Sequence, residues 1–310
     1  MKFGLYLLTA TAALALVAPT AGISATPPDI TGAPQMVVTV LPGPGGSRPG
    51  DLGAGEIRVD LNKTPAPVVS LQHLTGSLAD MQLFVLLDDS SRSSSLSIHF
   101  KELRDFFNSL PPTTKLAVGY MRNGTVVTAQ DFTADHEKAA AALRLPMAVP
   151  GVNGSPYFAL ADLVKRWPSS QPTGRRVVLM LTDGVDRYYG SADLDDPYMN
   201  DAIHGALKQG VMVYSIYLSG AGLYGRRGGP LVFGQSHLIQ VGEETGGYAY
   251  FEDFRDPVDI QPFLKDLRDR LENQYQVTFG DVHEKGFVPA KLHAESKNLK
   301  VTGPKLVYVP

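Results

Sequence analysis

Apolar runs without alternation mark the central part of the chain, and they predict strands that are buried on both faces of a parallel sheet. The clearest run spans residues 83–87, and the others cover residues 116–121, 176–182, 211–218 and 248–251. Between these runs, apolar residues recur at helical spacing, as in the shared face of Phe100, Leu103, Phe106, Phe107 and Leu110. Further helices are predicted over residues 136–145, 157–167, 198–209, 236–245 and 258–271. Strands alternating with helices over residues 80–272 predict a doubly wound α/β sheet.

One antiparallel hairpin is predicted within this sheet. Asn123-Gly124 is a two-residue turn sequence, and residues 125–132 follow it as a returning strand. The expected sheet is therefore mostly parallel, with an antiparallel hairpin at one edge.

The two ends of the chain show a different pattern. The leading segment, residues 26–79, contains expected strands at 35–41 and 56–61, and a proline-interrupted edge strand at 65–74. The trailing segment, residues 273–310, contains three expected strands at 275–280, 290–295 and 305–310. Because neither segment has enough apolar area to offset its ordering entropy alone, we expect them to pack together as a small β module.

The N-terminus has the pattern of a secretory signal peptide. Lys2 precedes an apolar stretch at residues 4–17, and small residues follow at 21–25. The stretch is too short to span a bilayer comfortably, so cleavage near residue 25 and a secreted or periplasmic protein without a membrane span are expected. An uncleaved N-terminal anchor is the alternative.

Composition excludes several classes of function. The chain has 310 residues, a net charge of −3 and no cysteine. The absence of a basic surplus argues against nucleic acid as a partner, and the absence of cysteine excludes disulfides and thiolate chemistry. The histidines show no paired metal-binding spacing, so a zinc site is not expected.

Candidate chemistry gathers where the first buried strand ends. Asp88 and Asp89 follow that strand directly, and a hydroxyl-rich sequence continues through Ser95. Open α/β sheets bind ligands at this edge, and hard oxygen atoms of this kind suit Mg²⁺, Mn²⁺ or Ca²⁺.

Several motifs in order resemble the von Willebrand factor type A domain. Asp89-Ser90-Ser91-Arg92-Ser93 resembles the D-x-S-x-S string of that family's metal-ion-dependent adhesion site. The family's later motifs are matched by the loop GVNGSPYFALADL, by LMLTDG, by VMVYSIYL and by LIQVGEETGGYAYF. The flanking β segments extend the resemblance to the VWFA-related family of secreted bacterial proteins.

This resemblance implies a divalent-cation site, Mg²⁺ or else Mn²⁺ or Ca²⁺. Its implied ligands are Asp89, Ser91, Ser93, Ser155 and Asp183. An alternative register begins at Asp88 and Ser90, but it would set the cationic Arg92 at a ligand position. The first register is therefore preferred, with Asp88 expected to orient a ligand or water.

The expected function is protein binding and not catalysis, with a carboxylate of the partner completing the cation's shell. Candidate partner-binding residues are Arg92, Tyr188, Tyr189, Arg226 and Arg227, because Tyr and Arg are enriched at binding hot spots. The alternative is a structural cell-envelope protein with a metal-free site. A hydrolase is less favoured, because Ser236 lies in only a partial nucleophile motif and is better interpreted as a helix N-cap.

Overall fold

The computed structural model describes residues 34–46, 49–50, 52–148, 154–171, 173–188, 196–219, 229–280 and 282–310. The predicted signal peptide, residues 1–25, lies outside these ranges. Within them, no helix is both long enough and apolar enough to span a membrane.

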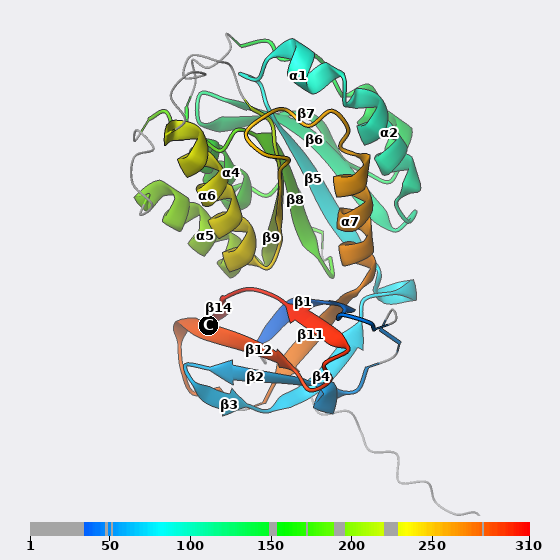
Figure 1. The fold of residues 1–310 in the computed structure, drawn as a ribbon, viewed down its shortest axis with the longest axis vertical. Coiled ribbons are helices and arrows are strands. Elements are labelled where there is room, and N and C mark those ends of the chain that lie inside the picture. Colours follow the sequence, from blue (N-terminus) through cyan, green and yellow to red (C-terminus); the bar gives the residue numbers. More distant parts are fainter. Residues whose placement is uncertain are drawn as a thin grey trace, which may run out of the picture. The chain divides into compact units, whose positions relative to one another are not determined.

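A six-stranded sheet forms the centre of the fold, in the order β10-β9-β8-β5-β6-β7 (Figure 1). Its strands are β5 (Met81–Asp88), β6 (Thr114–Arg122), β7 (Thr125–Thr133), β8 (Arg176–Thr182), β9 (Val211–Tyr217) and β10 (Ala249–Tyr250). All neighbouring pairs are parallel except β6 and β7. The predicted doubly wound sheet with one antiparallel edge hairpin is confirmed. Asn123 and Gly124 both have positive φ, as the tight turn requires.

Helices cover both faces of this sheet. One face carries α1 (Ser93–Ser97), α2 (Phe100–Ser109), α3 (His136–Ala141) and α7 (Gln261–Glu272). The other carries α4 (Pro156–Lys165), α5 (Pro197–Lys208) and α6 (Gly229–Thr245).

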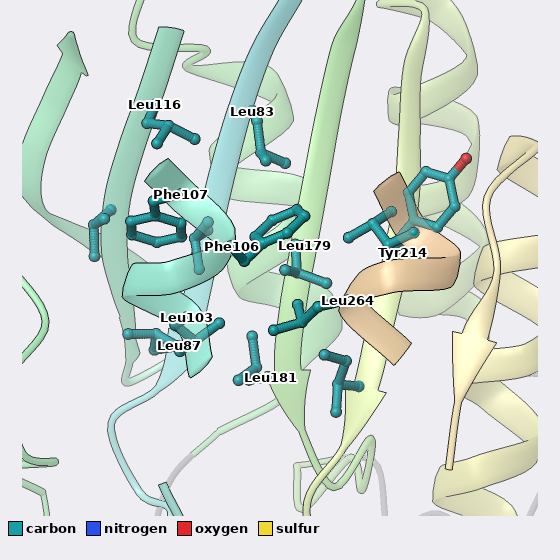
Figure 2. Packing of buried hydrophobic residues seen from close by; sticks show 14 of the residues in the cluster. Leu83, Leu87, Leu103, Phe106, Phe107, Leu116, Leu179, Leu181, Tyr214 and Leu264 are labelled. Carbon is teal, nitrogen blue, oxygen red and sulfur yellow. The ribbon is translucent and has the colours of Figure 1, made fainter. Parts of the chain in front are cut away.

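Alternate side chains of the central strand β5 belong to the apolar cores on the two faces of the sheet. Leu83, Val85 and Leu87 pack under α2 and α7, as Figure 2 shows for the two leucines. Phe84 and Leu86 pack on the opposite face, against α4 and α5. Each of these side chains is fully buried, which stabilises the fold by about 1.5–3 kcal/mol per residue.

The two ends of the chain form the predicted β module. One four-stranded sheet has the order β13-β1-β11-β4 and the other the order β14-β12-β2-β3. The leading strands are β1 (Gln35–Pro42), β2 (Ile57–Leu61), β3 (Thr64–Ala66) and β4 (Val68–His73). The trailing strands are β11 (Gln274–Phe279), β12 (Gly286–Ala294), β13 (Leu299–Thr302) and β14 (Leu306–Val309). Both sheets share one apolar core, to which Val38, Val59, Val277 and Val307 belong.

Arg175 holds the base of the central sheet to the segments that enter and leave it. Its guanidinium is buried and donates to the carbonyl of Ala79 (2.8 Å), the carbonyl of Leu271 (2.7 Å) and Oε1 of Gln274 (2.9 Å). Burial lowers the pKa of Arg175 to about 10. The charge is thus held by oxygen acceptors from the segment before β5 and from the segment that leads into β11.

Several elements differ from the sequence prediction: α1 was not predicted, and the expected strand at 65–74 is divided into β3 and β4. β13 was not predicted, because its four residues carry a weak pattern. The helix α3 ends at Ala141 instead of residue 145, because the following segment turns to bring the backbone N–H of Arg144 onto the hydroxyl of Tyr120 (2.6 Å). The helix α6 begins at Gly229, so Ser236 lies inside the helix and is not its N-cap.

Candidate functional site

Asp88 ends β5 on the face of the sheet that carries α4 and α5. Its Oδ1 accepts hydrogen bonds from the backbone N–H (2.9 Å) and hydroxyl (2.7 Å) of Ser90, and its Oδ2 accepts from the hydroxyl of Thr182 (3.0 Å). Burial raises the pKa of Asp88, and the nearby charge of Asp183 raises it further. Asp88 is therefore a buried acid held by hydroxyl groups, with a second acid close by.

Asp89 follows directly but points to the other face, where two arginines meet it. Arg122 donates through Nε (2.9 Å) and Nη2 (2.7 Å) to Oδ2, and Arg144 donates through Nη1 to Oδ1 (2.7 Å). The backbone N–H of Met147 also donates to Oδ1 (2.9 Å). Burial would raise the pKa of Asp89, but the hydrogen bonds from Arg144, Met147 and Arg122 outweigh it and hold that pKa below its usual value. Both oxygens of Asp89 are thus engaged by strong donors.

Asp183 follows β8 and is paired with an arginine four residues later. Nη2 of Arg187 contacts Oδ2 of Asp183, and Nη1 lies 3.2 Å from Oδ1. The backbone N–H of Val185 donates to Oδ1 as well (3.0 Å). The Arg187 side chain is only 11% exposed, and its charge also favours the ionised form of Asp88. A guanidinium therefore lies among the acids of this edge.

The predicted serine ligands fall into different environments. Ser91 is buried, and its hydroxyl has no hydrogen-bond partner among the described residues. Ser93 is exposed at the start of α1. Ser155 is buried as the N-cap of α4, where its Oγ accepts from the N–H groups of Tyr157 (3.1 Å) and Phe158 (3.4 Å). The structure does not bring Ser93 into the buried group that surrounds Asp88.

These contacts decide how well a divalent cation fits. Both acids of the preferred register, Asp89 and Asp183, already bind guanidinium groups that satisfy their oxygens. Within the described ranges, no group of three or more His, Cys, Asp or Glu side chains could hold a metal ion. The residues as arranged therefore do not fit Mg²⁺, Mn²⁺ or Ca²⁺. Asp88, the acid of the alternative register, is bound by the hydroxyls of Ser90 and Thr182 and by no guanidinium hydrogen bond among the described contacts.

The candidate partner-binding residues are only partly described. Arg92 is exposed in the loop after β5. Tyr188 is 70% exposed, and its ring contacts those of Phe158 (centroids 5.1 Å apart) and Tyr198 (6.0 Å). Tyr189, Arg226 and Arg227 lie outside the described residues.

Sequence reasoning missed the three arginines that neutralise the acids. Arg122 is the last residue of β6, and the adjacency of parallel β5 and β6 could have placed it beside Asp89. Arg187 could have been found from its spacing of four residues from Asp183. Arg144 carries no such signal, because it lies in an irregular segment after α3.

The partial nucleophile motif does not form a nucleophile turn. The Ser236 hydroxyl donates to the carbonyl of Val232 (2.9 Å), one turn earlier in α6. His237 is buried, and its ring meets the edge of Tyr157 with centroids 5.8 Å apart. Ser236 therefore lacks the strand-to-helix turn that exposes a hydrolase nucleophile.

Comparison with known proteins gives matches to solved structures only. No family model matches the sequence, and no curated protein matches it. An aerotolerance-related membrane protein from Bacteroides fragilis NCTC 9343, with multiple mutations to serines, is 14% identical over 62% of this chain and 98% of that chain, with a TM-score of 0.42. The conserved hypothetical protein BatB from Bacteroides thetaiotaomicron has the same identity and coverage, with a TM-score of 0.44.

A third similar structure is the SpRpn10 VWA domain, which is 10% identical over 60% of this chain and 94% of that chain, with a TM-score of 0.41. These values concern the fold alone. The fold itself is defined by the strand order, by the antiparallel edge strand β7 and by the helices on both faces. The central unit of this chain therefore has a von Willebrand factor type A-like fold.

Proposed function

We propose that this chain is a non-catalytic protein-binding module that holds an acidic side chain of its partner on Arg122 and Arg144. The observation that carries the proposal is that these two guanidinium groups share a single buried carboxylate, Asp89. The three groups together carry one excess positive charge at the carboxyl edge of the sheet.

Exposure and rigidity support this role. The Arg122 and Arg144 side chains are 35% and 31% exposed, so solvent or a partner reaches both. Arg144 lies over the Tyr120 ring, 3.6 Å from its centroid, and this contact fixes the plane of the guanidinium. Planar, preoriented guanidinium groups bind carboxylates in a bidentate way, which gives both strength and direction.

A partner on this edge would also meet exposed side chains of the predicted kind. Arg92 follows the same strand as Asp89 and adds a further positive charge. Tyr188 lies in the loop after the neighbouring strand β8, and it presents a large aromatic surface. Aromatic and arginine residues together are typical of binding hot spots.

This proposal keeps the partner carboxylate that the sequence predicts and replaces the cation by arginine. The alternative is a structural envelope protein whose edge binds nothing. The two alternatives differ in whether the protein binds acidic side chains, since a structural role requires no such binding.

The test uses a fluorescent oligoglutamate peptide, with oligoglutamine as its neutral control, and titrates the full chain by anisotropy. We expect oligoglutamate binding that persists in EDTA and weakens with salt, because the contact is ionic and metal-independent. Arg122→Lys keeps one charge against Asp89 but loses the planar fork, so it should weaken binding about tenfold, or about 1.4 kcal/mol. Lys101→Gln, at an exposed pair on α2, is the matched control. Equal affinity for the two peptides, or loss of binding in EDTA, would contradict the proposal.

Export of the protein is part of the same proposal. The predicted signal peptide would deliver this edge to partners outside the cytoplasm. Mass spectrometry of the exported protein should find an N-terminus near residues 22–26, and an intact Met1 would contradict it.

A further inference from the structure

Arg187 occupies an unusual position for an arginine. It follows β8 in the loop that begins with Asp183, and its backbone N–H donates to the carbonyl of Gly154 (3.3 Å). Its guanidinium contacts both oxygens of Asp183 and lies 3.3 Å from the carbonyl of Val185 through Nη1. The backbone and the side chain of Arg187 therefore connect the loop after β8 with the loop before α4.

A comparison within the chain shows that this burial is specific. Asp162 on α4 and Arg166 directly after that helix have the same spacing of four residues, and they also form an ion pair. The Arg166 side chain is 62% exposed, whereas that of Arg187 is 11% exposed. Asp183 is 2% exposed, so the Asp183 pair is withdrawn from solvent on both sides. A charge that is desolvated to this degree stays buried only when its partner neutralises it.

We propose that the guanidinium of Arg187 is the resident cation of this edge and excludes divalent cations from it. The guanidinium of Arg187 already supplies Asp183 with the positive charge that a metal ion would otherwise supply. Asp88 with Ser90, the buried hydroxyl of Ser91 and the carboxylate of Asp183 then form a set of oxygens that a divalent cation could use only after Arg187 is removed. This inference concerns Asp183 and Arg187 and is independent of the peptide contact proposed for Arg122 and Arg144.

The experiment titrates Mn²⁺ into the full chain by calorimetry and follows the melting temperature with and without the ion. The unaltered protein should bind no Mn²⁺ at about 1 mM, the range in which extracellular cation modules bind. Arg187→Gln removes the charge and keeps a similar length, so it should bind Mn²⁺ with a dissociation constant at least about tenfold below that limit of about 1 mM. Adding Asp183→Asn to that variant should abolish the gain. Arg166→Gln, at the exposed pair of the same spacing, should leave the chain without affinity for Mn²⁺.

The outcomes separate clearly. Binding of Mn²⁺ by the unaltered protein at submillimolar concentration would overturn the proposal. A lack of Mn²⁺ binding by the Arg187→Gln variant would overturn it as well. If Arg187→Gln is unfolded in EDTA, Mn²⁺ should restore its circular dichroism spectrum, because the ion replaces the missing charge beside Asp183. Failure of that rescue would also count against the proposal.

Discussion

Asp88 and Asp89 are neighbours in the chain, yet their carboxylates lie on opposite faces of the central sheet. Asp88 continues the series of Phe84 and Leu86 and meets Thr182, whereas Asp89 continues the series of Val85 and Leu87 and meets Arg122. Successive side chains of a strand alternate, so a shift of one residue exchanges every contact. Two adjacent acids therefore have separate partners and separate chemistry.

Ser90 should matter to stability and Ser93 should not. Ser90→Ala removes a buried hydroxyl that donates to Asp88 at 2.7 Å, and we expect it to lower the free energy of unfolding by about 1–2 kcal/mol. Ser93→Ala alters an exposed residue and should stay within about 0.5 kcal/mol of the unaltered protein. Urea denaturation of the two variants measures this difference. Equal effects would show that Asp88 does not depend on its hydroxyl partners.

Asp89 should contribute stability that disappears in acid. Its folded-state pKa lies below the usual value of 3.8, so the folded protein favours the ionised form. The contribution is therefore complete above pH 3.8 and is lost as the pH falls through the folded-state pKa. We expect Asp89→Asn to lower the free energy of unfolding at pH 7 by about 1–3 kcal/mol, and this deficit should shrink as the pH approaches about 3. Urea denaturation at a series of pH values tests it, and a deficit that is constant with pH would contradict it.

Arg175 should be far more sensitive to substitution than its neighbour Arg176. Arg175→Gln removes hydrogen bonds to Ala79, Leu271 and Gln274 in a buried place, and we expect a loss of about 2–3 kcal/mol. Arg176 bonds to Gln209 near the surface, so Arg176→Gln should change stability by about 0.5 kcal/mol or less. Thermal unfolding of the two variants provides the comparison. Similar losses would show that the acceptors around Arg175 are resolvated easily.

Removal of the trailing segment should release the leading strands. A variant ending at Asn273 lacks β11 and β13, the two strands between which β1 is paired. We expect amide hydrogen exchange over residues 35–42 to lose its protection, because the chain would leave these N–H groups without acceptors. Residues 81–88 of β5 serve as the internal control, since both neighbours of that strand remain. Retained protection in β1 would mean that the ends of the chain do not depend on each other.

Most of the fold could be predicted from the sequence because its signals are local. Buried runs such as residues 83–87, the turn at Asn123 and the amphipathic face of α2 each identify their element within a few residues. The short strand β13 and the start of α6 escaped because their patterns are weak. Ser236 was predicted as a helix N-cap because the part of α6 that precedes it, from Gly229 onward, was not recognised as helical.

The candidate site was predicted in composition more than in geometry. The sequence indicated that Asp88, Asp89 and Asp183 lie at the carboxyl edge of the sheet. The register of the predicted metal ligands was selected because the other register sets Arg92 at a ligand position. Arg92 turned out to be exposed, and the decisive cations were Arg122, Arg144 and Arg187. Of these, Arg144 belongs to an irregular segment that only the folded chain brings to Asp89. The alternation of core residues along β5 places Asp88 on the face of Phe84 and Leu86, and Asp89 on the face of Val85 and Leu87.

The sheet order β13-β1-β11-β4 also determines when β1 can pair during synthesis of the chain. During synthesis from the N-terminus, β1 is among the first strands made, but both of its neighbours are made after residue 273. The central sheet can close while both edges of β1 are still open. Open strand edges are templates for pairing with other chains. A chain whose synthesis stops before residue 274 therefore leaves both edges of β1 unpaired and open to pairing with other chains.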